Sequence, residues 1–546
     1  MPGSWLIGTL LVTFLVAAAA AFATRGLGAA TQRAVETVHV IAISIALLIG
    51  GLIVAEVAEG QRLSLLDGWL IVDPLGCNFL GLVVVVGLLT GLYSIGYLRH
   101  DIESGKIKAT DLSRYYGFFH LFLFTMVLAV TSNNLIMMWV SIEATTLTSV
   151  FLVGFYGHKT SLEAAWKYVV ICTVGVAFGL YGTVLVFADA NAALANAQSA
   201  ILWTEVVKHA ASLDRATISI AFAFVLIGFG TKAGLVPMHT WMPDAYSEAP
   251  SPSSALLTAG LANCALLVII RYAVITAKAV GPEFPQTLFL IFGIVSIGVA
   301  APLIFVQRDL KRLLAYSSVE NMGFIALGLG IGGPLGVAAA LLHALNHGLA
   351  KALMFCCSGN VLMKYGTRNL DTVKGVLRVA PVTGFLLIAG ALALSGAPPF
   401  NVFVSEFLTV TAGIKAGYAW LVVVCLLLLT VVLASFVQLI GGSILGPAPE
   451  SVRKGDLGAL TLAPLGLGLA LVLLMGLHVP APIARILAQA TSSVVETPAV
   501  ADRVVPARNP VENPHPTFAM DLHSDAGASL PGCARVQPRK DNACAN

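Results

Sequence analysis

The chain has 546 residues, of which 58% are hydrophobic and only 11% are charged, and its formal net charge is +3. An ordinary soluble domain carries about 25% charged residues, so this composition excludes a soluble enzyme and is typical of a polytopic helical membrane protein. The net charge is too small and too scattered to indicate a nucleic-acid partner.

Apolar runs long enough to cross a bilayer recur along the chain. The first run lacks a basic segment and a small-residue cleavage pattern, so we expect a retained helix and not a signal peptide. We predict an all-α protein with about fourteen transmembrane helices, the two longest runs being bent or broken, at residues 5–24, 38–57, 76–98, 116–131, 133–155, 166–188, 216–238, 253–276, 285–306, 313–331, 334–363, 381–412, 418–441 and 457–478.

Lysine and arginine residues are distributed unequally between the predicted loops. If the first helix begins outside the cytoplasm, the cytoplasmic loops carry sixteen of them and the opposite loops carry five. This bias predicts a multi-pass protein of the cytoplasmic (inner) membrane with its N terminus on the non-cytoplasmic side, and an even helix count places the C terminus there too. Beyond residue 490, Pro, Asn, Arg and Asp replace the apolar runs, so residues 491–546 are predicted to be a disordered or partner-bound tail.

The cysteines show no pattern typical of a metal or iron–sulfur site. We therefore expect no cofactor and no metal in this chain, and any redox chemistry would belong to a partner. The eight are Cys77, Cys172, Cys264, Cys356, Cys357, Cys425, Cys533 and Cys544.

Two predicted helices combine an ionisable residue with a helix break. Lys232 stands among glycines in the seventh run and is followed by Pro237, and Glu406 follows Ser395-Gly396-Ala397-Pro398-Pro399 in the twelfth. An ionisable residue inside a membrane is costly and usually marks an ion pathway, and an interrupted span usually marks a transport site. We predict broken helices in spans 7 and 12.

Further ionisable residues fall inside other spans. His343, His347 and Lys351 are spaced by four residues, so they share one helix face. Burial moves the pKa of carboxyl and amino groups toward the range in which protons are exchanged, and histidine already titrates near neutral pH. The set therefore predicts a proton relay of Glu143, Lys167, Lys232, Glu320, His343, His347, Lys351 and Glu406.

Each member also has a structural alternative. Lys167 lies near a helix start, with Glu163 one turn before it, so its ammonium can instead extend to the membrane surface. Glu143 can act as a protonated hydrogen-bond donor in helix packing, and His343 alone would more often be a hydrogen-bonded core histidine.

The order of these spans predicts an internal repeat. From Glu143 to Lys232, and again from Glu320 to Glu406, the chain runs polar span, polar span, broken span. Two five-helix units related by a pseudo-twofold axis in the membrane plane would give this order. The predicted parts are N-terminal helices (residues 1–115), a first repeat (116–280), a second repeat (281–445), helix 14 (446–490) and the tail.

Six segments resemble the antiporter-like subunits of respiratory complex I, Mrp-type cation antiporters and energy-converting hydrogenases. The segment around Glu143 and the one ending in Trp166-Lys167 are most similar to the F-type component of hydrogenase 4 and formate hydrogenlyase complexes. The segments are residues 138–146, 159–168, 232–245, 309–318, 343–351 and 403–407.

The resemblance implies fourteen helices with inverted repeats around a central polar axis. It implies that Glu143 and Lys232 form a controlling ion pair, that His343 and His347 are intermediate relay groups, and that Glu406 is the terminal exchange residue.

The chain departs from the family pattern at two places. Complex I relatives carry a lysine where this chain has Asn263, and they often carry a histidine where it has Glu320-Asn321.

We therefore expect a proton-translocating, antiporter-like membrane subunit of an energy-converting oxidoreductase complex. It would hold no redox centre of its own and would assemble with other membrane subunits and a peripheral redox or soluble module. One alternative is a cation-translocating subunit of a non-hydrogenase complex, such as inorganic-carbon uptake or Mrp-like Na⁺/H⁺ antiport. Another is a scaffold in which the charges only hold helices together.

Overall fold

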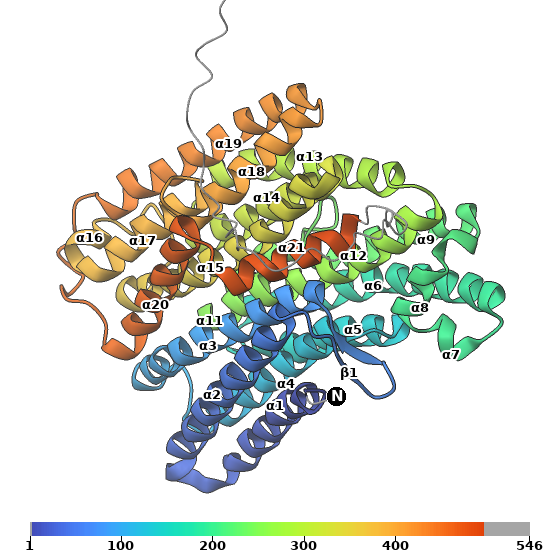
Figure 1. Ribbon diagram of the computed structural model, residues 1–546. Coiled ribbons are helices and arrows are strands. Elements are labelled where there is room, and N and C mark those ends of the chain that lie inside the picture. Colours follow the sequence, from blue (N-terminus) through green and yellow to red (C-terminus); the bar gives the residue numbers. More distant parts are fainter. Residues whose placement is uncertain (1–2, 496–546) are drawn as a thin grey trace, which may run out of the picture. The chain divides into compact units, whose positions relative to one another are not determined.

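The structure, a computed structural model, describes residues 3–495 and is built almost entirely of helices (Figure 1). The N-terminal part contains α1 (Trp5–Ala23), the 3₁₀ segment η1 (Thr24–Ala30), α2 (Thr31–Ala58), the antiparallel strands β1 (Leu63–Leu65) and β2 (Leu70–Val72), and α3 (Pro74–Glu103).

The middle part contains α4 (Asp111–Thr131), α5 (Leu135–Val153), α6 (Lys159–Leu194), α7 (Ala197–Ala200), α8 (Trp203–Lys208), η2 (Ala210–Ser212), α9 (Arg215–Ala233), α10 (Met242–Glu248), α11 (Ser251–Leu256), the π-helical turn η3 (Leu257–Leu261) and α12 (Ala262–Ala279). The C-terminal part contains α13 (Glu283–Val306), α14 (Leu310–Ile331), α15 (Gly333–Tyr365), α16 (Val376–Val379), α17 (Pro381–Leu394), α18 (Asn401–Lys415), α19 (Ala419–Leu439), the π-helical turn η4 (Ile440–Ile444), α20 (Ala459–Leu477) and α21 (Ala481–Val495).

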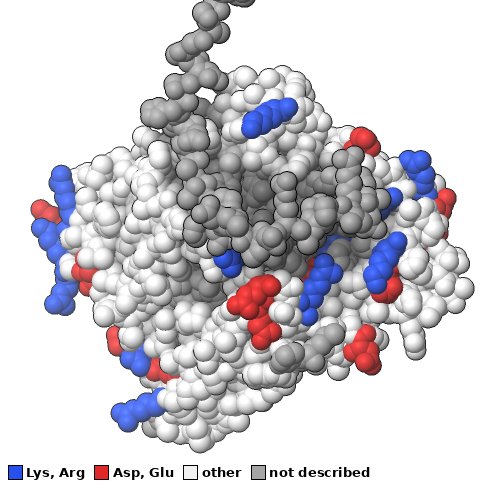
Figure 2. Space-filling model, in the orientation of Figure 1, with Lys and Arg blue, Asp and Glu red and all other residues white. Residues whose placement is uncertain are grey.

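The predicted fold class, an all-α multi-pass membrane protein, is confirmed. In the described part of the chain, thirteen helices are long and apolar enough to cross a bilayer. The run predicted at 381–412 is divided into α17 and α18, which are each too short to qualify. On the face drawn in Figure 2, most of the described surface is uncharged, and Lys, Arg, Asp and Glu gather in a few small groups.

The two predicted helix breaks are present. Gly234 ends α9 with a φ of +84°, a left-handed conformation that favours glycine, and Pro237 cannot donate the hydrogen bond that would continue the helix. Gly396, with a φ of +69°, and the two prolines after it separate α17 from α18 in the same way.

The predicted break or bend at 334–363 is wrong as a break, because α15 runs through all 33 of its residues. After its first turn this helix contains glycines but no proline, and a helix tolerates isolated glycines.

Neighbouring helices pack in two similar groups. α6 packs against α9 and α4 against α5, while α14 packs against α13 and α15, and α15 against α18. The groups touch where Phe222 of α9 contacts Phe284 and Phe289 of α13. The two predicted repeats and their inverted relationship stay a prediction.

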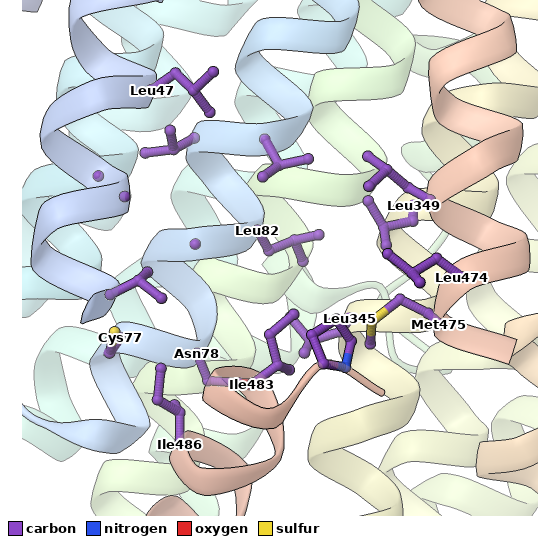
Figure 3. Close-up of a pocket in the computed structure, with 18 residues that line it drawn as sticks. Leu47, Cys77, Asn78, Leu82, Leu345, Leu349, Leu474, Met475, Ile483 and Ile486 are labelled. Atoms are coloured by element: carbon purple, nitrogen blue, oxygen red, sulfur yellow. The ribbon is translucent and has the colours of Figure 1, made fainter. Parts of the chain in front are cut away.

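Helix α21 was not predicted. Its residues 491–495 fall in the segment predicted to be a tail, and the rest of that segment, from residue 496, lies outside the described residues. α21 packs against α2, α3 and α15. A cavity of about 290 Å³ lies between these helices and α20, and its lining is almost entirely apolar (Figure 3). No predicted relay residue lines it, so it is not the candidate site.

A buried ion pair joins the start of α3 to α12. The Arg271 guanidinium donates to both carboxylate oxygens of Asp73, at 2.8 and 3.2 Å, and lies 4.5 Å from the Trp203 ring. Asp73 also caps α3 by accepting from the Gly76 N–H at 2.8 Å. Burial alone would raise the pKa of Asp73, but the Arg271 guanidinium and the Gly76 N–H lower it below its usual range.

Replacing Arg271 with methionine is expected to lower the free energy of unfolding by about 3–5 kcal/mol, because it leaves a buried carboxylate without its partner. Thermal unfolding in detergent measures the loss. The double variant Asp73→Leu/Arg271→Met should lose clearly less stability than Arg271→Met, since no charge is left buried. An equal loss of stability in the two variants would contradict this account. A lowered folded-state pKa stabilises the protein above the unfolded value of about 3.9, so in the native chain this contribution should disappear as the pH falls through the folded-state pKa.

Candidate functional site

Lys232 lies in the last turn of α9, directly before the break, and is fully buried. Its ammonium nitrogen donates to the Tyr168 hydroxyl at 3.0 Å and lies 4.7 Å from the centre of that ring. The Tyr168 hydroxyl is 2.7 Å from the Ser149 hydroxyl of α5. Trp241, after the break, donates to the Thr231 carbonyl at 2.8 Å and so satisfies one backbone group that the broken helix exposes. These contacts tie the broken helix to α6 and α5.

Glu143 lies on α5 near this lysine. Its Oε1 accepts from Thr173 at 3.1 Å, and its Oε2 is buried without a hydrogen-bond partner in the described part of the protein. Its charge is close enough to attract that of Lys232, but no ion pair within 4.0 Å joins the two. The ion pair implied by the family resemblance is therefore not formed in this structure, where Lys232 is bonded to Tyr168.

Lys167 is exposed and lies apart from the buried groups. Its ammonium pairs with Glu163 at 2.8 Å, as the spacing predicted, and with Asp244 of α10 at 3.1 Å. Asp244 also pairs with Arg312 of α14 at 2.8 Å. The structure thus favours the surface alternative for Lys167 over membership of a buried relay.

Glu248, the last residue of α10, forms a second set of contacts. Thr160 donates to its carboxylate at 2.7 Å, and Arg368 donates to it and also pairs with Asp309 at 2.6 Å. Burial raises the pKa of Glu248, but these two donors outweigh it and leave that pKa below its ordinary value. The two acidic residues of α10 therefore hold this short helix against α6, α14 and the segment after α15.

Asn263 is the position at which the family resemblance leads us to expect a lysine. It is fully buried on α12, two residues after the π-helical turn η3, a feature that is frequent at functional sites. Its Nδ2 donates to the Ala259 carbonyl at 2.8 Å, and its Oδ1 has no hydrogen-bond partner in the described protein. An amide does not titrate, so this position can bind a hydrogen-bond donor but cannot hold a proton.

The second cluster is centred on His343 of α15. Its Nε2 is 3.1 Å from Oδ1 of Asn321, and its Nδ1 is 3.0 Å from the Ser405 hydroxyl. Asn321 also donates to the Glu320 carboxylate at 2.5 Å. Glu406 follows Ser405, and its carboxylate lies directly against Gly396, where a side chain would collide with it. A continuous set of contacts thus runs from α14 through α15 to the break before α18.

His347 and Lys351 complete the predicted stripe on α15. Both are fully buried, and neither ring nitrogen of His347 has a hydrogen-bond partner among residues 3–495. The Lys351 ammonium donates to the Leu314 carbonyl at 2.9 Å, and its charge is close enough to attract that of Glu320. Within the described residues, the side-chain hydrogen bonds of this cluster do not extend to Lys232.

Sequence reasoning missed several neutral members of both clusters. Tyr168 follows Lys167, Asn321 follows Glu320, and Ser405 precedes Glu406. In each case the only available signal was a polar residue beside a predicted one. In the described part of the chain, no group of three His, Cys, Asp or Glu residues is placed to hold a metal ion.

Comparison with known proteins places these residues in a family. A model described as "NADH:quinone oxidoreductase/Mrp antiporter, TM" matches residues 132–433, and one described as "NADH-Ubiquinone oxidoreductase (complex I), chain 5 N-terminus" matches residues 67–106. The first match includes all eight predicted relay residues.

Two curated relatives and one solved structure agree with this. A "Hydrogenase-4 component F homolog" of Methylacidiphilum infernorum is 40% identical over 342 residues, covering 63% of this chain and 72% of the relative. "NADH-quinone oxidoreductase subunit N" of Desulforudis audaxviator is 30% identical over 392 residues, covering 71% and 75%.

The solved structure is a chain of the membrane-bound sulfane sulfur reductase, an archaeal respiratory membrane complex. It superposes with a TM-score of 0.80 at 23% identity, covering 90% of this chain and 98% of that one. This likeness shows the fold alone. With the family match over more than half of its length, the chain belongs to the NADH:quinone oxidoreductase/Mrp antiporter family of membrane subunits.

Proposed function

We propose that this chain moves protons through Lys232 as the antiporter-like subunit of a hydrogenase-4-type membrane complex. Its relatives are hydrogenase-4 and NADH-quinone oxidoreductase subunits, and its assembly partners are other membrane subunits of such a complex. The observation that carries the proposal is a fully buried lysine at a helix break, bonded to Tyr168 and within electrostatic range of Glu143.

The Lys232 site has the parts of a switch. An ammonium bonded to a neutral hydroxyl is held less strongly than one paired with a carboxylate. Approach of Glu143 therefore favours a protonated Lys232, and its withdrawal favours release of the proton. The break after Ala233 exposes backbone groups, and side chains satisfy two of them: Trp241 donates to the Thr231 carbonyl, and Ser296 accepts from the Val236 N–H. An interrupted span usually marks a transport site, so we place the entry or exit of the proton here.

The His343 site supports two protonation states. Because Asn321 donates its amide hydrogens to Glu320 and the Ser317 carbonyl, its Oδ1 faces His343 and requires a hydrogen on Nε2. The Nδ1 then accepts from the Ser405 hydroxyl. When Nδ1 gains a proton it donates to Ser405 instead, whose hydrogen turns to the Val402 carbonyl at 2.9 Å. His343 can thus take and return a proton with the rotation of one hydroxyl, beside Glu406.

We place the chain in the cytoplasmic membrane with its N terminus outside, which the sixteen against five basic residues of the loops support. Asp244, Glu248, Arg312 and Arg368 then lie on the cytoplasmic side. A peripheral redox module completes the proposed complex.

Replacing Lys232 with alanine is expected to abolish coupled proton movement, because the group that is loaded and unloaded is gone. Proton uptake by proteoliposomes containing the whole purified complex measures this with a pH-sensitive dye. Lys208→Ala is the matched control, since Lys208 is exposed and pairs only with Glu205. Undiminished pumping by Lys232→Ala would refute the proposed role.

Replacing Tyr168 with phenylalanine keeps the ring under the Lys232 ammonium but removes the hydroxyl. A hydrogen bond to a charged group contributes about 1.5–3 kcal/mol, so we expect proton flux to fall by roughly tenfold. Tyr181→Phe on the exposed face of the same helix should leave flux unchanged. A normal proton flux in Tyr168→Phe would contradict a role for the hydroxyl, because the aromatic ring alone would then be enough for proton movement.

We infer that the driving reaction occurs in a partner subunit, because the cysteine pattern of this chain is not typical of an iron–sulfur site. Purification through a tag on this chain is expected to recover other membrane subunits together with nickel-hydrogenase and iron–sulfur subunits, identified by mass spectrometry and metal analysis. Recovery of a soluble partner without redox subunits would instead support the inorganic-carbon alternative.

A further inference from the structure

A second buried cluster of ionisable side chains lies in the N-terminal helices, outside the proposed relay. His39 of α2 and His120 of α4 are both fully buried, and Nδ1 of His39 is 3.1 Å from Nε2 of His120. Nδ1 of His120 has no hydrogen-bond partner among the described residues, and Nε2 of His39 lies against the backbone of Gly91 on α3, which can hydrogen-bond to the His39 ring. Each ring therefore has one nitrogen in the shared hydrogen bond and one outer nitrogen at which a proton can be exchanged.

An ion pair lies one helical turn from His39, toward the surface of the protein. Glu36, one turn before His39, accepts from Nε of Arg99 at 2.9 Å and from Nη2 at 2.5 Å, and the Arg99 side chain is 42% exposed. The Tyr116 ring lies 4.2 Å from the His39 ring, and its hydroxyl is 3.1 Å from that of Ser94. The remaining rings against the pair, Phe14 and Phe119, are apolar.

The depth of the pair follows from its place in the helices. His39 and His120 stand eight and nine residues after the first residues of α2 and α4, or about 12–14 Å along each helix. Both helices begin at loops predicted to face the cytoplasm. The ion pair thus lies toward the cytoplasmic side and the histidines near the middle of the membrane.

We propose that His39 and His120 form a proton wire from the cytoplasmic side toward α5, a proposal that rests on the proton-translocating function above. In the starting state His39 carries its hydrogen on Nδ1 and donates it to Nε2 of His120, whose own hydrogen is on Nδ1. A proton from the Glu36 side binds Nε2 of His39, the shared hydrogen crosses to Nε2 of His120, and the hydrogen on Nδ1 of His120 leaves. One proton enters, one leaves, and both tautomers are reversed.

We infer that the exit from His120 leads along α4 toward α5. The next hydroxyl on α4 is that of Thr125, which lies 3.4 Å from the Thr148 hydroxyl of α5. Helix α5 carries both Glu143 and Ser149, the residue bonded to Tyr168. The wire therefore ends beside the helix from which Lys232 is controlled.

Glutamine tests the wire, because its amide can keep a hydrogen bond in packing but cannot take up one proton and release another. Proton flux should fall by about tenfold in His39→Gln and in His120→Gln. The double variant should be no slower than either single variant, because the two histidines act in series and loss of one already interrupts the path. The measurement uses the whole complex in proteoliposomes, with the exposed His478→Gln as control and thermal unfolding as a check of folding. In the single variants the solvent deuterium isotope effect on flux should rise, which a loss of packing alone would not cause.

Wild-type flux in the folded double variant, with Lys232→Ala inactive, would overturn the wire and leave the proposed function intact. Wild-type flux in Lys232→Ala would instead refute the proposed function. If the histidine variants do not assemble, Gly91→Ala decides, because its added methyl would lie 3.0 Å from Nε2 of His39 and obstruct the entry atom while both histidines remain. Normal flux in a folded Gly91→Ala complex would then overturn the proposal.

Discussion

A charged side chain buried among apolar helices must find a partner or give up its charge, and the centre of this protein is arranged around that constraint. Lys232 is fully buried, and its partner is a tyrosine hydroxyl and not a carboxylate. A neutral partner keeps the lysine in place without fixing its proton. Glu143 lies within electrostatic range of Lys232 but forms no ion pair with it, so under the proposed function small movements of α5 relative to α9 would change which charge state of Lys232 is favoured.

The same constraint has a different outcome at the membrane surface. Asp244 and Glu248 pair with cations from α6, α14 and the segment after α15, and most of these side chains are partly exposed. An exposed ion pair contributes about 0–1 kcal/mol, but a helix of seven residues has little stability of its own, so several pairs decide where α10 lies. Since α10 begins after the break that follows Lys232, its anchors connect the lysine site to α14 in the other helix group.

Features encoded locally could be predicted from the sequence. The helix breaks depend on Gly234, Pro237 and Gly396, and the polar stripe on α15 follows from a spacing of four. The partners of these residues could not be predicted, because Tyr168 and Ser405 are ordinary helix residues whose role exists only in tertiary contact. Asp73 and Arg271 are 198 residues apart, and His39 and His120 are 81 apart, so no sequence pattern joins them. The relay role of Lys167 stays a prediction, since a charge near a helix start looks the same in the sequence whether it faces inward or, as in this structure, pairs with acidic residues at the surface.

Buried polar atoms are hydrogen-bonded as a rule, and an unsatisfied one costs about 1–3 kcal/mol. Along the predicted relay and at Asn263, four such atoms have no partner in the described part of the protein. They are Oε2 of Glu143, Oδ1 of Asn263 and both ring nitrogens of His347, on α5, α12 and α15, and further unpartnered atoms lie elsewhere, for example on Asn78 and Ser251. Unpartnered atoms alone therefore do not mark a proton path, but under the proposed function each of these four could bind a proton carrier. Asn263 would then be a binding point that holds no charge, and it would divide the proposed relay into a Lys232 segment and a His343 segment that need not titrate together.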